Sequence, residues 1–247
     1  MLRRVLLVLT FVVCALGVVG YQATRPEKGA SSPRVFVPSA QFFRDFSPSF
    51  RTTIADAYWL RTVQYYGEHA SGDRQFDSLW PMLDLVTRLS PHFVRPYRFG
   101  AFALLDAGRA DLSYELLKRG HAANPDEWAL LTHLGFFAYM YGSTADKDVV
   151  AAEWYQKASE LPGAPEWAGR VAARLLVKGG ERQKATIQWA QVYGDGDQYS
   201  RERALAELDR LLPADPAARQ REVAALREFM SADSFRDFSQ ALLDGTL

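Results

Sequence analysis

Apolar residues in this chain recur with a helical spacing that short polar segments interrupt. Downstream of residue 50 they return every three or four positions, and Phe50, Ile54, Ala57 and Tyr58 fall on one face of a helix. Residues that disfavour helix interiors interrupt this spacing at Ser71-Gly72, Ser90-Pro91, Ala107-Gly108, Asn124-Pro125, Tyr141-Gly142, Pro162-Gly163, Gly179-Gly180 and Gly194-Asp195-Gly196. The pattern predicts helices of about 10–18 residues. It predicts no strands, because no long run alternates between apolar and polar positions.

The interruptions and the small residues near them repeat along the chain. Pro91 and Pro125 lie 34 residues apart, as do Gly67 and Ala101. The Ala-x3-Tyr-x2-Ala pattern that starts at residue 151 returns 34 residues later as Ala-x3-Trp-x2-Val. Two helices per 34 residues resemble the tetratricopeptide repeat, TPR, over about residues 60–195. A coincidental array of helices is the alternative, and the shared offsets of proline, glycine and alanine favour the repeat.

The resemblance implies an all-α fold, a right-handed α-solenoid of TPR-like helical hairpins. In the third unit the family pattern is Leu131, Leu134-Gly135 and Ala138, followed by Ala151, Tyr155 and Ala158. Small residues are expected where the two helices of a unit cross, at Gly67, Ala101, Gly135 and Ala173 on the first helices and at Ala151 and Ala185 on the second.

The chain departs from the family pattern at three places. Leu79 and Ser113 stand where the family has alanine. Pro81 falls inside the second helix of the first unit, so this helix is expected to start late or to kink. The third unit carries about four extra residues around 142–146, which predict a longer turn.

The first 23 residues predict a segment that enters or crosses a membrane. Two arginines precede an uncharged, mostly apolar run over residues 5–23, which is the order of a secretory signal and nearly the length of a membrane span. We predict an uncleaved signal-anchor helix with its arginines in the cytoplasm. A signal peptide cleaved after Gly17 or Gly20 is the alternative. Val13 before Cys14 argues against a lipoprotein, which needs a small residue there.

These patterns divide the chain into four segments: the anchor at 1–23, a linker at 24–49, the TPR-like repeats at 50–198 and capping helices at 199–247. Proline and small residues predict that the linker is extended. Its apolar side chains, Val35, Phe36, Val37, Phe42, Phe43 and Phe46, are expected to pack on the body or on a membrane partner. The C-terminal segment predicts amphipathic helices with a polar outer face.

The distribution of charge narrows the class of partner. The chain has 29 basic and 29 acidic residues, which argues against a nucleic-acid-binding protein. Residues 1–28 hold four basic residues and one acidic residue, so the remainder has a net charge of −3. The single cysteine, Cys14, excludes a disulfide framework and a cysteine zinc site.

No motif for catalysis or metal binding is found in the sequence. The four histidines, His69, His92, His121 and His133, lack the spacing of metal ligands, and each is predicted near a helix end or a turn. Residues 195–197 (Asp-Gly-Asp) lack the remainder of a calcium loop. We therefore expect that the protein is not an enzyme, and that it has no catalytic residue, no metal-binding residue and no cofactor.

In the TPR family the first helix of each unit lines a concave groove that binds peptides. Carrying those positions over gives ten candidate partner-binding residues: Arg61, Arg95, Arg98, Phe102, Phe136, Tyr139, Trp167, Arg170, Arg174 and Lys178, with Gln64, Glu68 and Thr132 beside them. Arginines bind carboxylates and aromatic rings supply contact area, so an acidic or C-terminal segment of a partner protein is expected. Two alternatives remain: neighbouring acids pair with these cations, or linker residues 35–46 fill the groove.

The sequence thus predicts a non-enzymatic scaffold for protein–protein interaction, an accessory subunit of a membrane or cell-envelope complex. Its predicted location is the bacterial inner membrane, crossed once, with the body in the periplasm and with no nucleic-acid partner. One alternative is a soluble periplasmic chaperone or adaptor released by signal cleavage. A more distant one is an envelope hydrolase.

Overall fold

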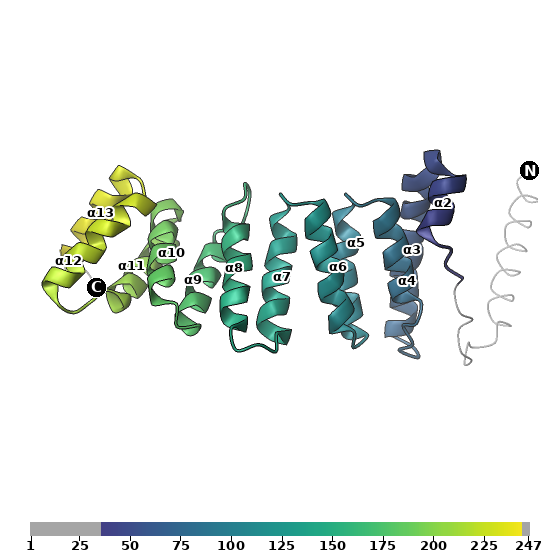
Figure 1. Cartoon of the computed structure of the whole chain (residues 1–247), viewed down its shortest axis with the longest axis horizontal. Coiled ribbons are helices and arrows are strands. Elements are labelled where there is room, and N and C mark those ends of the chain that lie inside the picture. The colour runs from purple at the N-terminus through teal and green to yellow at the C-terminus, as the bar shows by residue number, and fades with distance from the viewer. Residues whose placement is uncertain (1–35, 244–247) are drawn as a thin grey trace, which may run out of the picture. The chain divides into compact units, whose positions relative to one another are not determined.

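A computed structural model describes residues 36–243 of the chain (Figure 1). Contacts divide the chain into two units, Met1–Phe36 and Val37–Leu247, and the second unit contains every helix described below. The predicted anchor and the first part of the linker lie outside the described residues and stay predictions. Within residues 36–243, no helix is both long enough and apolar enough to cross a bilayer.

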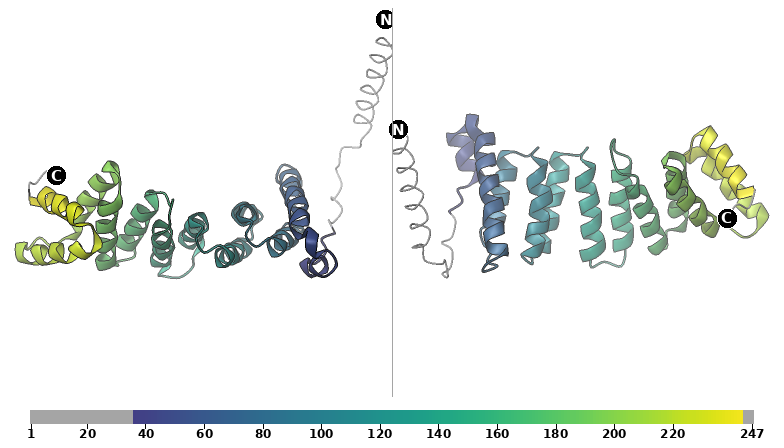
Figure 2. Two further views of the ribbon diagram at one scale, coloured as in Figure 1. Left: turned by 90° about the horizontal axis from the view of Figure 1, so that it is seen from above. Right: turned by 180° about the vertical axis from the view of Figure 1, so that it is seen from behind.

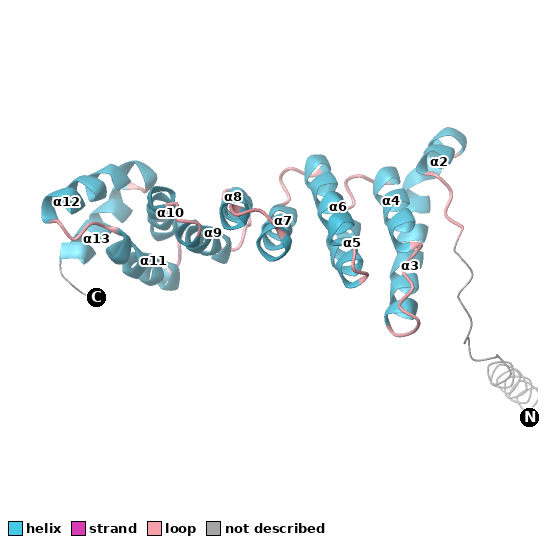
Figure 3. Cartoon of the chain, turned by 60° about the horizontal axis from the view of Figure 1, so that its bottom comes forward, coloured by secondary structure: helices cyan, strands magenta, loops and turns pink. Residues whose placement is uncertain are grey.

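The described residues form helices joined by turns and loops, with no strand among them (Figure 3). The α-helices are α2 (Ala40–Phe46), α3 (Arg51–Ala70), α4 (Leu79–Leu89), α5 (Val94–Asp106), α6 (Ala110–Ala123), α7 (Trp128–Tyr141), α8 (Lys147–Ser159), α9 (Trp167–Lys178), α10 (Arg182–Asp195), α11 (Gln198–Leu211), α12 (Pro216–Ala225) and α13 (Ala232–Leu243). Two short 3-10 helices, η1 (Pro48–Phe50) and η2 (Leu226–Phe229), join them. The all-α prediction is confirmed.

Each helix packs mainly on its neighbours in sequence. The pairs α3–α4, α5–α6, α7–α8 and α9–α10 pack closely, and α8–α9 and α10–α11 join one pair to the next. Figures 1 and 2 show these helices side by side in chain order. Helices α5 and α7 also touch each other, as do α9 and α11. Side chains also join α3 to α5, through Trp59 and Phe99, and α7 to α9, through Tyr139 and Lys178. The first helices of successive pairs are therefore neighbours.

Helices end at the helix-breaking residues that the sequence marks, and the turns at two of these places are bonded to each other. Helix α4 stops just before Ser90-Pro91, and α6 stops just before Asn124-Pro125. The side-chain amide of Asn124 donates to the carbonyl oxygen of Pro91 at 3.0 Å and to that of Gly120 at 3.0 Å. Equivalent turns of two successive units are thus bonded through one side chain, which supplies a physical reason for a polar residue at this break.

The three departures from the repeat each have a local explanation. Pro81 is the third residue of α4, within the first turn, where a backbone N–H has no intrahelical partner to lose. Residues 142–146 form the turn between α7 and α8, as predicted. The hydroxyl of Ser113 donates to the carbonyl oxygen of Ala101 at 2.7 Å and bonds α6 to α5, so a serine at this position is fully buried without an unpaired oxygen.

The small residues of the first helices do not all have the role that the repeat predicts. A methyl group at Gly135 would lie 2.7 Å from the ring of Tyr155, and one at Gly100 would lie 2.6 Å from Leu83. Ala101 and Ala173 are fully buried. Gly67, in contrast, is exposed, and a methyl group there would meet nothing within 4 Å. The prediction for Gly67 is wrong, because that face of α3 has no helix against it.

Substitution by alanine at Gly135 and at Gly67 is expected to change the stability of the protein in opposite directions. Gly135→Ala places Cβ against the Tyr155 ring and lowers the free energy of unfolding by about 1–3 kcal/mol. Gly67→Ala adds no contact and raises it by about 0.5–1 kcal/mol, since glycine is a poor residue inside a helix. Urea unfolding followed by circular dichroism measures both. Equal shifts of the same sign would contradict the packing described for Gly135.

The described part of the linker is folded rather than extended. Residues 40–46 form α2, whose Ser39 side chain accepts from the Phe42 N–H at 3.2 Å and caps the helix. Ala40, with Val37 and Phe43 beside it, packs against a cluster from α3 and α4 that includes Leu85. One apolar face of α2 is thus buried on the body of the protein. This segment packs on the first helical pair and leaves the later first helices uncovered.

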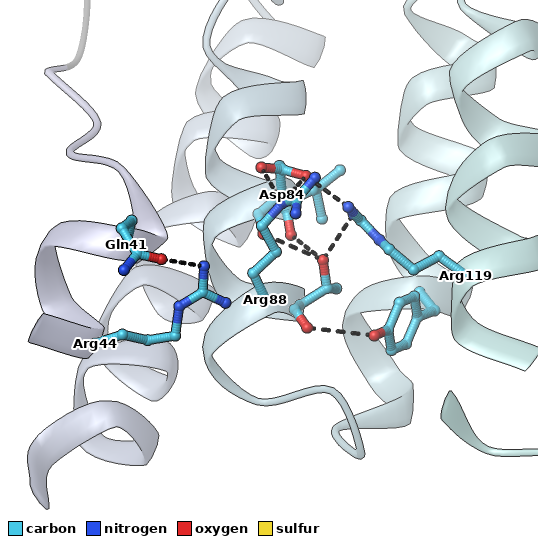
Figure 4. Close-up of polar contacts among 8 residues, drawn as sticks. Gln41, Arg44, Asp84, Arg88 and Arg119 are labelled. Atoms are coloured by element: carbon cyan, nitrogen blue, oxygen red, sulfur yellow. Dashed lines mark hydrogen bonds and ion pairs between the residues drawn. The ribbon is translucent and has the colours of Figure 1, made fainter. Parts of the chain in front are cut away.

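Polar contacts fix α6 to α4 where their side chains meet (Figure 4). Asp84 accepts from Arg119 at 2.5 Å and from Arg88 at 2.8 Å, and Arg119 also donates to Thr87 at 2.8 Å. The Arg119 side chain is only about one-quarter exposed, so its charge needs these partners. The guanidinium also lies over the Trp80 ring at 5.4 Å. These contacts set the register between the first and second pairs.

Candidate partner-binding surface

The ten residues predicted to bind a partner, here named the candidate surface, all lie on first helices of the pairs. Arg61 lies on α3; Arg95, Arg98 and Phe102 on α5; Phe136 and Tyr139 on α7; and Trp167, Arg170, Arg174 and Lys178 on α9. Within one helix the members are separated by three or four residues, which places them on the same face. Helices α5 and α7 touch each other, so the members of the candidate surface on these two helices are neighbours.

Aromatic side chains bridge α5 and α7 at the centre of the candidate surface. Phe102 is exposed, and its ring centroid lies 6.0 Å from that of Phe136 and 5.8 Å from that of Phe137. The ring of His133 meets Phe102 edge-on at 5.1 Å. An exposed aromatic ring held by other rings offers a rigid apolar contact at low entropic cost.

His133 belongs to this cluster, although the sequence analysis placed it near a helix end or turn. It lies in the middle of α7, and its Nδ1 is buried without a partner among the described residues. Burial, and secondarily the positive charge of Arg98, lower the pKa of His133 to about 4. The imidazole is therefore neutral near pH 7, so the positive charge here comes from the arginines. The distance of His133 from the nearest helix-breaking pair was the available signal.

Four of the six cations of the candidate surface are unpaired within the described residues. Arg61, Arg95, Arg98 and Arg174 are exposed and have no hydrogen-bond or ion-pair partner there. An exposed guanidinium keeps all five N–H donors available for a carboxylate. The alternative in which neighbouring acids neutralise the surface does not apply to these four arginines.

The other two cations contact side chains of the protein itself. Lys178 pairs with Asp148 at 3.2 Å and lies 4.6 Å from the centroid of the Tyr139 ring, and the bond to Asp148 is the main cause of its raised pKa. Arg170 lies over the Tyr199 ring at 5.2 Å and donates to the hydroxyl of Ser200. For Lys178 the pairing alternative holds, because α8 brings Asp148 beside it. Arg170 contacts a ring and a hydroxyl of α11 rather than an acid, and sequence spacing reveals neither contact.

Trp167 lies at the start of α9, at the far end of the candidate surface. Its ring is exposed and meets Tyr155 of α8 at 6.0 Å. Four cavities of about 280 to 470 Å³ lie elsewhere, and their walls include none of the ten residues and not His133. Exposed arginines and rings spread over four helices suit an extended segment better than a small molecule.

The described residues contain no group of three or more potential ligands placed to hold a metal ion. Carboxyl groups with lowered pKa such as Asp106 beside Arg74 and Asp111 beside Arg109 lie at the surface in ion pairs, and the pKa of Asp197 is lowered mainly by its hydrogen bonds with Ser200. Among the described carboxyl groups and histidines, only His133 is both largely buried and strongly shifted in its pKa. Its nearest ring neighbour is a phenylalanine, which cannot act as a nucleophile.

No known protein family matches this chain, and no curated protein matches its sequence. The geometry of the candidate surface therefore carries the functional argument.

Proposed function

We propose that this protein is a non-enzymatic scaffold of TPR-like hairpins, tethered to a membrane by its N-terminal helix, that holds a partner protein on the candidate surface. Its place is in a membrane or cell-envelope complex, with the body on the periplasmic side of the bacterial inner membrane. The pairing of consecutive helices supports a solenoid, and the sequence of residues 1–23 supports the tether.

One observation carries the proposed binding role. Four arginines on the first helices are exposed and unpaired in the described chain, and two of them, Arg95 and Arg98, precede the exposed ring of Phe102 on the same helix. Unpaired arginines beside aromatic rings are frequent in protein interfaces. A carboxylate can take two parallel N–H bonds from one guanidinium.

The partner segment that fits is acidic, or ends in a free carboxylate. Its charged groups would meet Arg98 on α5 and Arg174 on α9, and its apolar side chains would contact Phe102 and Phe136 between them. The packing of α2 on α3 and α4 supports a free surface, since residues 37–46 are engaged elsewhere.

The test uses the full chain purified from detergent-solubilised membranes, followed by quantitative mass spectrometry of the proteins that accompany it. Arg98→Ala combined with Arg174→Ala is expected to abolish recovery of the native partner. The control, Arg227→Ala combined with Arg236→Ala, removes the same charge from two exposed arginines near the C-terminus and should leave recovery unchanged.

Equal recovery with both double variants would overturn the binding role of the candidate surface. The tether is tested separately on the same material. Sequencing the N-terminus of the mature protein should find residues 1–23 present, and a protein that starts after Gly17 or Gly20 would favour the soluble chaperone or adaptor.

A further inference from the structure

Three phenylalanines near the start of the described chain are exposed, although the helix that carries two of them is well packed. Phe42 and Phe46 lie on α2 with exposures of 49% and 75%, and Phe50 ends η1 with an exposure of 64%. The adjoining face of α2 packs Ala40 and Phe43 on α3 and α4, and the Phe42 ring meets that of Phe43 edge-on at 5.5 Å. Helix α2 is thus apolar over two adjoining faces, and only the face with Ala40 and Phe43 packs on the body within the described residues.

The two exposed rings of α2 act as one surface. Phe42 and Phe46 are one helical turn apart, and their ring centroids lie 5.0 Å from each other. Two adjacent rings exposed to water are unfavourable, because each forfeits the free energy that burial would provide. Something outside residues 36–243 is therefore expected to cover them.

Two cations flank these rings. Arg44 lies on α2, between Phe42 and Phe46 in sequence, and Arg51 follows Phe50; both are exposed. Arg44 donates to the side-chain oxygen of Gln41 at 2.9 Å (Figure 4), and Arg51 donates to the carbonyl oxygen of Pro48 at 3.1 Å. Neither forms an ion pair with an acid in the described chain. Their charges are free for an anionic surface.

The length of chain before this surface limits what can cover it. The apolar run ends at Ala23, and twelve residues separate it from Phe36. A chain of twelve residues spans at most about 40 Å when it is fully extended. If the apolar run crosses a bilayer, the beginning of the body is held within that distance of the lipid headgroups.

We propose that Phe42, Phe46 and Phe50, together with Arg44 and Arg51, form a surface that inserts into the interfacial region of the bilayer that holds the N-terminal helix. The proposal rests on the membrane tether of the proposed function. Aromatic rings favour the headgroup level of a bilayer, and arginines add attraction to anionic lipids. The second contact would fix the orientation of the body against the membrane, which a single point of attachment cannot do.

The test measures lipid contact at one residue of the full chain. The only cysteine, Cys14, is replaced by Cys14→Ser, and Phe46→Cys is labelled with an environment-sensitive fluorophore. The protein is reconstituted into vesicles of phosphatidylethanolamine and phosphatidylglycerol that contain lipids with a nitroxide near the headgroup. The control label is placed by Tyr199→Cys on α11, at a residue of similar exposure, 57%.

We expect the nitroxide lipids to quench the label at residue 46 several-fold more than the label at residue 199. Replacing phosphatidylglycerol with phosphatidylcholine should weaken the quenching at residue 46, because Arg44 and Arg51 lose their anionic partners. Unchanged quenching in that experiment would contradict the role of the two arginines.

Flotation of the vesicles separates the failure of this inference from the failure of the tether. Protein that floats with the vesicles but shows equal, weak quenching at both labels keeps its tether and overturns the lipid contact. Protein that does not float overturns the tether and this inference with it. A label at residue 46 that is shielded only when a partner protein is added also overturns the inference, since the surface is then a protein interface.

Discussion

Trp189→Ala is expected to lower the free energy of unfolding by about 3–5 kcal/mol, the usual cost of removing a large buried aromatic side chain. Trp189 is 1% exposed and is the largest fully buried side chain in the described chain. It belongs to a cluster in which α10 meets Leu208 of α11, Leu226 of η2 and Phe238 of α13. The substitution leaves a cavity at the junction of these four elements. Urea unfolding monitored by circular dichroism measures the loss.

The effect of Trp189→Ala should also be local. The helices pack mainly on their neighbours in sequence, so hydrogen exchange is expected to speed up in α11 and α13 and to change little in α5 and α6. Trp167→Ala is the matched control, because Trp167 is exposed, and its loss should cost less than about 1 kcal/mol. A similar loss of stability in the two variants would contradict the C-terminal core.

The second large effect is a loss of stability in acid through His133. The pKa of His133 is about 4 in the folded protein, against about 6.5 in an unfolded chain. Between these two values the unfolded state binds a proton that the folded state excludes, so stability falls as the pH is lowered from 6.5 to 4. At about 1.4 kcal/mol per pH unit, the loss reaches about 3 kcal/mol.

His133→Gln isolates this contribution from the carboxyl groups that titrate in the same range. The free energy of unfolding is measured for the parent chain and the variant at pH 7.5 and at pH 4.5. The parent should lose about 2–3 kcal/mol more than the variant on acidification. Equal losses would show that His133 titrates normally, which would contradict its burial against Phe102.

The helical fold and the hairpin pairing follow from features that the sequence displays directly. Breaking residues end helices because of their own backbone preferences, so the positions of Pro91 and Pro125 predict turns without any tertiary information. Ala101, Ala151, Ala173 and Ala185 are all fully buried, as the 34-residue sequence pattern predicts for small residues where helices cross.

Two differences lie at the first helical pair, α3–α4, and in the segment before it. Gly67 has the sequence position of a residue at a helix crossing, but no helix of the described chain packs against it. The repeat pattern therefore predicted a packing role that Gly67 does not have. The segment 40–46 was predicted to be extended because prolines surround it, yet α2 forms since Ser39 caps it and α3 with α4 buries one face. A packing partner of this kind overrides local composition, and a sequence pattern does not reveal it.

At the candidate surface, too, the sequence does not reveal which side chains become partners. The spacing along α5 and α7 places arginines and aromatic rings on first helices, which sequence reasoning can predict. The pairing of Lys178 with Asp148 and of Arg170 with Ser200 depends on which helices meet. His133 was missed as a member, because a histidine within an apolar helix has no motif that marks it.

The most direct test of the central claim, that this surface holds a partner segment, is photocrosslinking at Phe102 in the full chain. Phe102 is replaced by a photoreactive benzophenone amino acid in cells that make the protein, and the crosslinked peptide is identified by mass spectrometry. The same amino acid at Glu115, an exposed position on α6, is the control. We predict a crosslink at residue 102 alone, to an acidic or C-terminal segment of one partner, that disappears with Arg98→Ala and Arg174→Ala. No crosslink beyond that at residue 115, or a crosslink to the protein's own residues 24–46, would contradict the claim.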